Sequence, residues 1–335
     1  MGMATAGALL GLGALGVVGM GCGAGDGDTP VTTTTADRPV IAATTPILGA
    51  VVREAVGDGA EVRVIMPNGS DPHEWRPSAK DVATLQEADL VVENGLNLEE
   101  GLGKAVAQAR KGGTPVFTAT EHVTVRQQGD EPDAGDGDDE HGHSDDEHGH
   151  DDEAPGHDDH GHGAGDPHFW TDPAQVRSVT LALPSAVKKA TGVDVSVTSR
   201  QAARQLAAVD RAIAKDVAAI PKGSRNLVTG HESLGYFADR YGLQVVGAVT
   251  PSLSSQGQVS AAHLAALEAA MRKAGVKVLF TETGLPDAVS DAVVKETGAT
   301  VVEVGTEVLP ADGSYMTYIK EMGRRISSAL ANPRG

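Results

Sequence analysis

Short apolar runs alternate with amphipathic helical patterns along the chain from Pro39 onward, and this alternation constrains the fold more than any other feature. The first set of expected strands covers 40–44, 61–66, 89–93 and 115–118. Helical patterns occupy 46–57, 78–88 and a segment that starts near Asn97, and Ser78 with Asp81 resembles a capping box. Such alternation is typical of parallel strands joined by crossover helices.

The same alternation resumes after residue 221. Expected strands cover 226–229, 244–249, 276–281 and 300–304, and expected helices cover 232–241, 260–274, 286–297 and 314–330. Between the two sets, residues 198–220 contain no Gly or Pro and carry one apolar stripe at spacings of three and four. We therefore expect an α/β protein of two lobes with parallel sheets, at 38–195 and 222–335, joined by a single long linker helix at 196–221.

The first residues resemble an export signal. An apolar stretch from Ala4 to Met20 is too short and too rich in Gly to span a membrane well, and it ends directly before Cys22, the only cysteine. We expect residues 1–21 to be a signal peptide and 22–37 a flexible tether. Lipidation of Cys22 would anchor the protein to the outer face of the cytoplasmic membrane, with a periplasmic location as the alternative.

The formal charge of −19 is concentrated in one segment, because residues 130–166 hold sixteen Asp or Glu and no Lys or Arg. The rest of the chain has a net charge of about −3 and no cluster of basic residues, so we expect no nucleic-acid binding. The segment also contains seven histidines, namely His141, His143, His148, His150, His157, His160 and His162. With almost no apolar residues, 129–166 is expected to be a disordered loop that collects metal weakly, or a charged spacer.

Three other histidines occupy distinctive positions. His73 lies in Asp-Pro-His-Glu-Trp and His168 in Asp-Pro-His-Phe-Trp, so one pattern occurs twice and uses both tryptophans. His231 follows the expected strand 226–229, at the strand end where open α/β sheets place ligands. Imidazole is a preferred nitrogen ligand of zinc, so the three predict a metal site between the lobes. His122 and His263 are expected to be surface or packing residues, and Glu74 is either a neighbour of the metal or a solvated side chain.

These motifs, together with Cys22, the acidic His-rich loop, the run from Thr229 to Phe237 and Phe280-Thr281-Glu282, resemble the metal-binding receptors of zinc and manganese ABC importers. The resemblance covers about Pro39 to Leu330. It implies two α/β lobes joined by one long helix, with a metal held by three histidines, here His73, His168 and His231, and a carboxylate. Glu307 matches the position of that carboxylate, and Asp312 or water are the alternatives.

The resemblance implies an extracytoplasmic zinc receptor, expected to be a monomer, that delivers Zn²⁺ to a membrane permease and its ATPase. A manganese receptor of the same family and an extracellular metal buffer or adhesin-like protein are the alternatives. A metallohydrolase is disfavoured because the sequence has no His-Glu-x-x-His helix, nucleophile elbow or phosphate-binding glycine loop. We therefore expect no enzyme activity.

Overall fold

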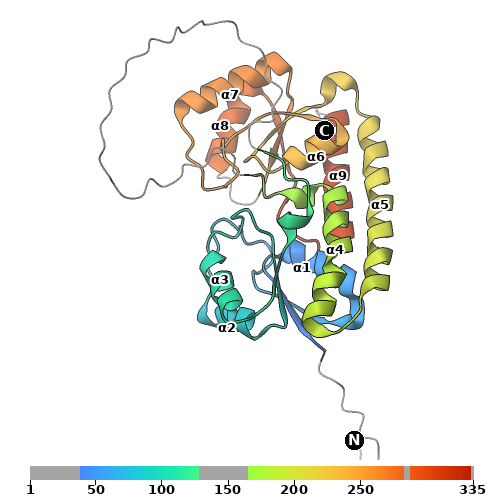
Figure 1. The fold of residues 1–335 in the computed structure, drawn as a ribbon. Helices are drawn as coiled ribbons and strands as arrows, with labels where there is room; N and C mark the ends of the chain where they lie inside the picture. Colours follow the sequence, from blue (N-terminus) through green and yellow to red (C-terminus); the bar gives the residue numbers. More distant parts are fainter. Residues whose placement is uncertain (1–37, 128–164, 283–286, 333–335) are drawn as a thin grey trace, which may run out of the picture. The chain divides into compact units, whose positions relative to one another are not determined.

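The computed structural model describes residues 38–127, 165–282 and 287–332, and within them the strands form two four-stranded parallel sheets (Figure 1). The first sheet has the order β2-β1-β3-β4 and the second β6-β5-β7-β8, so both share one topology. The strands are β1 (Val40–Ala43), β2 (Glu61–Val64), β3 (Leu90–Glu93), β4 (Val116–Thr118), β5 (Asn226–Thr229), β6 (Gln244–Ala248), β7 (Val278–Thr281) and β8 (Thr300–Glu303). The predicted class, two α/β lobes with parallel sheets, is confirmed.

Helices lie between the strands and after the last one. They are α1 (Pro46–Val56), α2 (Ala79–Glu87), α3 (Gly103–Lys111), α4 (Pro173–Thr191), α5 (Ser196–Ala218), α6 (Gly235–Tyr241), α7 (Ala261–Ala274), α8 (Asp287–Thr297) and α9 (Tyr315–Ala331), with short 3₁₀ segments η1 (Gly57–Gly59), η2 (Ala119–His122), η3 (Phe169–Thr171) and η4 (Lys222–Ser224). Side-chain caps start several of them. Thr45 caps α1 with Pro46 behind it, and Ser78 forms the predicted capping box with Asp81.

Two predicted helix starts are wrong. The helix expected from Asn97 begins at Gly103, because Leu96 and Asn97 have φ values of 52° and 58°, in the left-handed region that a helix cannot use. The helix expected from Glu232 begins at Gly235. There the backbone N–H of Glu232 donates to the carbonyl of Ser252 instead of starting a helix.

Helix α4 lies in a region for which the sequence patterns gave no helix. Asp172 caps it by accepting a hydrogen bond from the N–H of Ala174, and Pro173 occupies the first turn. Pro184 lies inside the helix without ending it. The sequence Asp-Pro at the start was the available signal for this helix.

Helix α5 packs against elements of both lobes. It contacts α1 and α4 on the first-lobe side and α9 on the second-lobe side, and Figure 1 shows α4, α5 and α9 side by side. One continuous apolar core joins them, with Leu48 of α1, Ile213 of α5 and Ile319 of α9 as members. Separate smaller cores lie under α2 and α3 and under α7 and α8. A core shared by both lobes favours small relative motions over wide hinge opening.

Polar contacts also join the lobes. The side chain of Asn68 donates to the carbonyl of Leu309 (3.0 Å) and accepts from its N–H (2.8 Å). Glu54 of α1 accepts hydrogen bonds from the hydroxyl of Ser314 (2.8 Å) and the N–H of Met316 (3.2 Å), so it caps the start of α9. These contacts fix the lobes beside the segment that carries Glu307.

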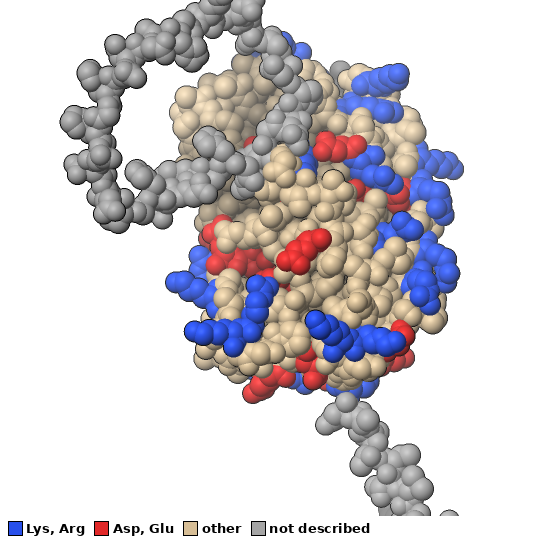
Figure 2. Space-filling view, in the orientation of Figure 1, with Lys and Arg blue, Asp and Glu red and all other residues tan. Residues whose placement is uncertain are grey.

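The described surface carries charges of both signs. Figure 2 shows Lys and Arg along the edge where α5 runs, with Asp and Glu in smaller groups between them. Among the described residues, no helix combines the length and apolar character that crossing a membrane would require.

The contact between α1 and β2 gives a test of the packing. A Cβ on Gly49 would lie 2.4 Å from a methyl carbon of Val64, whereas one on Gly103, at the start of α3, would meet no atom within 4 Å. We expect Gly49→Ala to lower the free energy of unfolding by about 1–3 kcal/mol through overpacking. Gly103→Ala should raise it by about 0.4–1 kcal/mol because the unfolded chain loses freedom. Thermal or denaturant unfolding of both variants measures the difference, and equal effects would contradict the described packing.

Candidate metal centre

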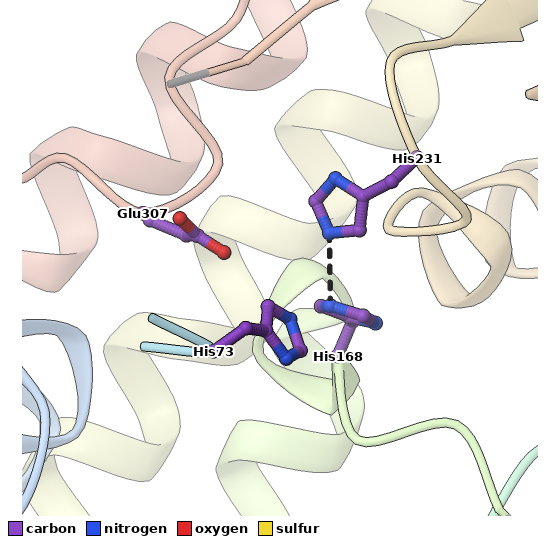
Figure 3. A group of neighbouring side chains, drawn as sticks. All are labelled: His73, His168, His231 and Glu307. Atoms are coloured by element: carbon purple, nitrogen blue, oxygen red, sulfur yellow. Dashed lines mark hydrogen bonds between the residues drawn. The ribbon is translucent and has the colours of Figure 1, made fainter. Parts of the chain in front are cut away.

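Four side chains that are far apart in sequence converge where the lobes meet. His73, His168, His231 and Glu307 each offer one ligand atom, and these atoms all lie within 4.8 Å of one another (Figure 3). All four residues are buried, with exposed fractions of 5% or less. The Nε2 atoms of His168 and His231 are only 3.2 Å apart. The four predicted site residues are therefore brought together in one cluster.

The two Asp-Pro-His motifs form the same local turn. Asp71 Oδ1 accepts a hydrogen bond from the N–H of His73 at 2.9 Å, and Asp166 Oδ1 accepts one from the N–H of His168 at 2.9 Å. A carboxylate that bonds the N–H two residues on makes an Asx turn, and proline restricts the residue between. The motif thus fixes the backbone from which each imidazole projects.

The two tryptophans have different roles. Trp170 donates its indole N–H to the carbonyl of Thr306 at 2.9 Å, and its ring lies against His168 with centroids 5.2 Å apart. It therefore ties the His168 turn to the segment before Glu307. Trp75 instead packs, half-buried, against the apolar core under α2 and α3.

His231 extends the carboxyl end of β5, as its position after that strand predicted. Its Nδ1 lies 2.7 Å from Glu282 Oε2, and Glu282 follows β7, the neighbouring strand. Glu282 is buried and also accepts a hydrogen bond from the hydroxyl of Ser233. Two adjacent strand ends therefore supply the imidazole and the carboxylate that orients it.

Glu307 follows β8 and joins the cluster, whereas Asp312 does not. The Oε1 atom of Glu307 is buried without a hydrogen-bond partner, and so are both ring nitrogens of His73. Asp312 is exposed, and it accepts hydrogen bonds from the N–H of Ser314 (3.0 Å) and the hydroxyl of Thr317 (2.7 Å) at the start of α9. Buried polar atoms without partners are rare, and a cation in the cluster would satisfy one nitrogen of His73 and the Glu307 oxygen.

Burial and mutual charge shift the pKa values of the cluster. Burial, with the charges of His168 and His231, lowers the pKa of His73 to about 3. Burial alone lowers the pKa of His231, but the charge and hydrogen bond of Glu282 outweigh it and raise the value to about 9. Burial raises the pKa of Glu307 to about 8, although His231 opposes the rise. Without a cation, both His231 and Glu307 are therefore protonated near neutral pH.

The remaining predicted residues lie elsewhere. His122 stacks on Phe117 with centroids 4.5 Å apart, and His263 Nε2 bonds the carbonyl of Ala248 at 2.8 Å, so both have the packing roles expected. Glu74 is exposed next to His73 and is not a member of the cluster. Cys22 and the seven loop histidines lie outside the described residues.

The prediction that Asp166 belongs to the disordered loop 129–166 is wrong. The residue is fully buried, and its Oδ1 lies 2.8 Å from Nδ1 of His168. Its N–H donates to the carbonyl of Arg126 at 2.7 Å, next to an antiparallel bridge between Gln127 and Gly165. The ordered part therefore resumes at Gly165. The repeated Asp-Pro-His motif was the signal that could have placed Asp166 with the site.

Three imidazole nitrogens and one carboxylate oxygen form a donor set suited to zinc, and the part of the chain that the structure describes contains no cysteine. Two α/β lobes with such a buried cluster between them define a metal-binding protein. A family model described as "Zinc-uptake complex component A periplasmic" matches residues 41–329, and the chain belongs to this family. Membership in an uptake family places the chain among metal-binding receptors, not among enzymes.

Some relatives of this chain are named for zinc and others for manganese. The chain is 26% identical to the zinc-binding protein TroA of Treponema pallidum, over 88% of this chain and 89% of that protein. It is 30% identical to the high-affinity zinc uptake system protein ZnuA of Paracoccus denitrificans (88% and 93%) and 24% identical to the manganese-binding lipoprotein MntA of Halalkalibacterium halodurans (85% and 85%). The solved structure of TroA has the same fold, with a TM-score of 0.69, 22% identity, and coverage of 88% of this chain and 100% of that one.

The pKa values predict how pH affects metal affinity. A bound cation needs the lone pairs of His231 and Glu307, whose pKa values of about 9 and about 8 mean that protons compete with it near neutral pH. Affinity should therefore rise with pH, with a logarithmic slope of about two between about pH 7 and pH 8 from His231 and Glu307, which falls to about one and then to zero above pH 9. This range lies above the reference imidazole pKa of about 6.5, on which a sequence-based expectation would rest. Chelator competition at stepwise pH measures the slope, and a flat profile above about pH 7 would contradict the assignment.

Proposed function

We propose that this protein is an extracytoplasmic receptor that captures zinc between its lobes through His73, His168, His231 and Glu307, and delivers it to an ABC importer. The observation that carries the proposal is the convergence of these four buried side chains, within 4.8 Å, from segments on both lobes. Membership in a zinc-uptake family supports delivery to a transporter rather than storage.

The ligand types favour zinc over manganese. Imidazole nitrogens suit zinc, whereas manganese is commonly bound by sites richer in oxygen. Three of the four groups in the cluster are histidines, and the fourth offers a carboxylate. The zinc names of two relatives point the same way, and the manganese-binding relative keeps manganese as the alternative cargo.

The proposal includes the setting of the receptor. The predicted signal peptide and Cys22 suggest a lipidated chain on the outer face of the cytoplasmic membrane, and MntA, a relative, is named a lipoprotein. Its partners would be a permease and the associated ATPase. The receptor would act as a monomer, because both lobes that contribute to the cluster come from one chain. The lobes would correspond to 38–195 and 222–335, with the linker helix at 196–221.

Removing two of the three imidazoles tests the site. We expect the double variant His73→Ala, His168→Ala to bind zinc only at micromolar concentrations or above, because a carboxylate and one imidazole leave too few fixed donors. The matched control is His122→Ala, His263→Ala, which removes two histidines outside the cluster and should keep wild-type affinity. Competition with a chelator of known affinity measures both, and sub-micromolar binding by the first variant would disprove the assignment.

Deleting the His-rich segment separates a receptor from a metal buffer. Residues 130–163 should be replaced by a short Gly-Ser linker, which keeps the bridge between Gln127 and Gly165 and the buried Asp166. A receptor should retain one tight zinc site per chain and lose only weak binding. A buffer should lose nearly all bound zinc. Titration calorimetry gives both the stoichiometry and the affinity.

A further inference from the structure

Two imidazoles of the cluster have a carboxylate behind the ring. His168 Nδ1 lies 2.8 Å from Asp166 Oδ1, and His231 Nδ1 lies 2.7 Å from Glu282 Oε2. In both, Nε2 points to the other imidazole of the pair. A carboxylate at Nδ1 selects the tautomer that leaves the Nε2 lone pair for a metal and fixes the plane of the ring.

His73 has no such contact at hydrogen-bonding distance. Its Nδ1 is buried without a hydrogen-bond partner, and the side chain is only 3% exposed. The carboxylate in reach is that of Glu100, whose Oε1 lies 3.9 Å from Nδ1 and whose side chain is 35% exposed. A shift of about 1 Å would bring this pair to the spacing of the other two.

The second lobe holds Glu100 from the other side. Ser254 donates its hydroxyl hydrogen to Glu100 Oε1 at 3.2 Å. The next residue, Ser255, donates to Asp71 Oδ2 at 2.5 Å, while the other oxygen of Asp71 accepts the N–H of His73. The segment after β6 therefore contacts both carboxylates that adjoin His73.

We propose that Glu100 is a positioning residue for His73, which accepts a hydrogen bond from Nδ1–H when a cation occupies the cluster through Nε2. This inference rests on the proposed function. Through Ser254, the orientation of His73 depends on contact between the lobes, whereas His168 and His231 are supported by buried carboxylates next to their own segments. The competing interpretation is that Glu100 is a solvated surface carboxylate.

These interpretations are separated by the zinc affinities of two variants that each lose one negative charge. Glu100→Ala removes the acceptor, and Glu74→Ala removes an equal charge from the exposed residue next to His73. We expect Glu100→Ala to weaken zinc binding about ten-fold or more, the loss typical for a carboxylate that orients a metal-bound imidazole. Glu74→Ala should change it by less than about three-fold, because exposed charges act weakly through solvent. Glu100→Gln should recover part of the affinity, since its amide oxygen can accept the same hydrogen bond.

A second measurement reports on the imidazole itself. In zinc-loaded protein with ¹⁵N-labelled histidine, an Nδ1–H that donates to a carboxylate and is shielded from water gives a slowly exchanging NMR signal. The wild type and Glu74→Ala should show such a signal for His73, His168 and His231. Glu100→Ala should lose only that of His73, and Ser254→Ala should speed its exchange.

A retained His73 signal in Glu100→Ala, or equal affinities of Glu100→Ala and Glu74→Ala, would overturn the proposal. Because Glu100 is exposed, the metal-free variant should melt like the wild type, and Ser254→Ala provides a second test if it does not. Failure of the wild type to bind zinc tightly would instead refute the proposed function.

Discussion

The structure depends on holding several ionisable groups together away from water. Three imidazoles and a carboxylate, each at most 5% exposed, would be costly to bury without compensation. In the absence of a cation the protein compensates by redistributing protons, since His73 is neutral with a pKa near 3, His231 is charged beside Glu282, and Glu307 has its pKa raised to about 8. A divalent cation at the proposed site would replace the protons on His231 and Glu307 and give His73 and Glu307 a partner for atoms that otherwise have none.

The connection between the lobes determines how such a site can work. One apolar core runs from α1 through α5 to α9, and the contacts of Asn68 with Leu309 and of Glu54 with the start of α9 strengthen it. Wide opening would break buried packing as well as these hydrogen bonds. Access to the cluster is therefore expected from local movement of segments next to it, such as the one after β6 that carries Ser254 and Ser255, and not from rotation of whole lobes.

The sequence predicted the two-lobe α/β class and the four residues that converge, because strand periodicity, helix caps and a repeated motif are local signals. It did not predict how the imidazoles are held. Asp166 was assigned to the acidic loop because its sequence neighbours are acidic, and its burial depends on Arg126 and Tyr236 from other parts of the chain. Helix α4 was missed although Asp172-Pro173 marks its start, and the left-handed turn at Leu96 could not be foreseen because Leu rarely adopts that conformation.

The two Asp-Pro-His-x-Trp segments share a backbone turn, but the contacts of their imidazole rings depend on other parts of the chain. In both, aspartate bonds the N–H of the histidine, so the motif sets the backbone turn. The rings differ because their surroundings differ. Asp166 also bonds Nδ1 of its histidine, whereas Asp71 is engaged by Ser255 and leaves Nδ1 of His73 to face Glu100 at 3.9 Å. A receptor must release what it binds, and three equally supported imidazoles would resist release. If Glu100 orients His73 as proposed, its contact with Ser254 of the other lobe makes this one ligand sensitive to movement between the lobes, which would assist release.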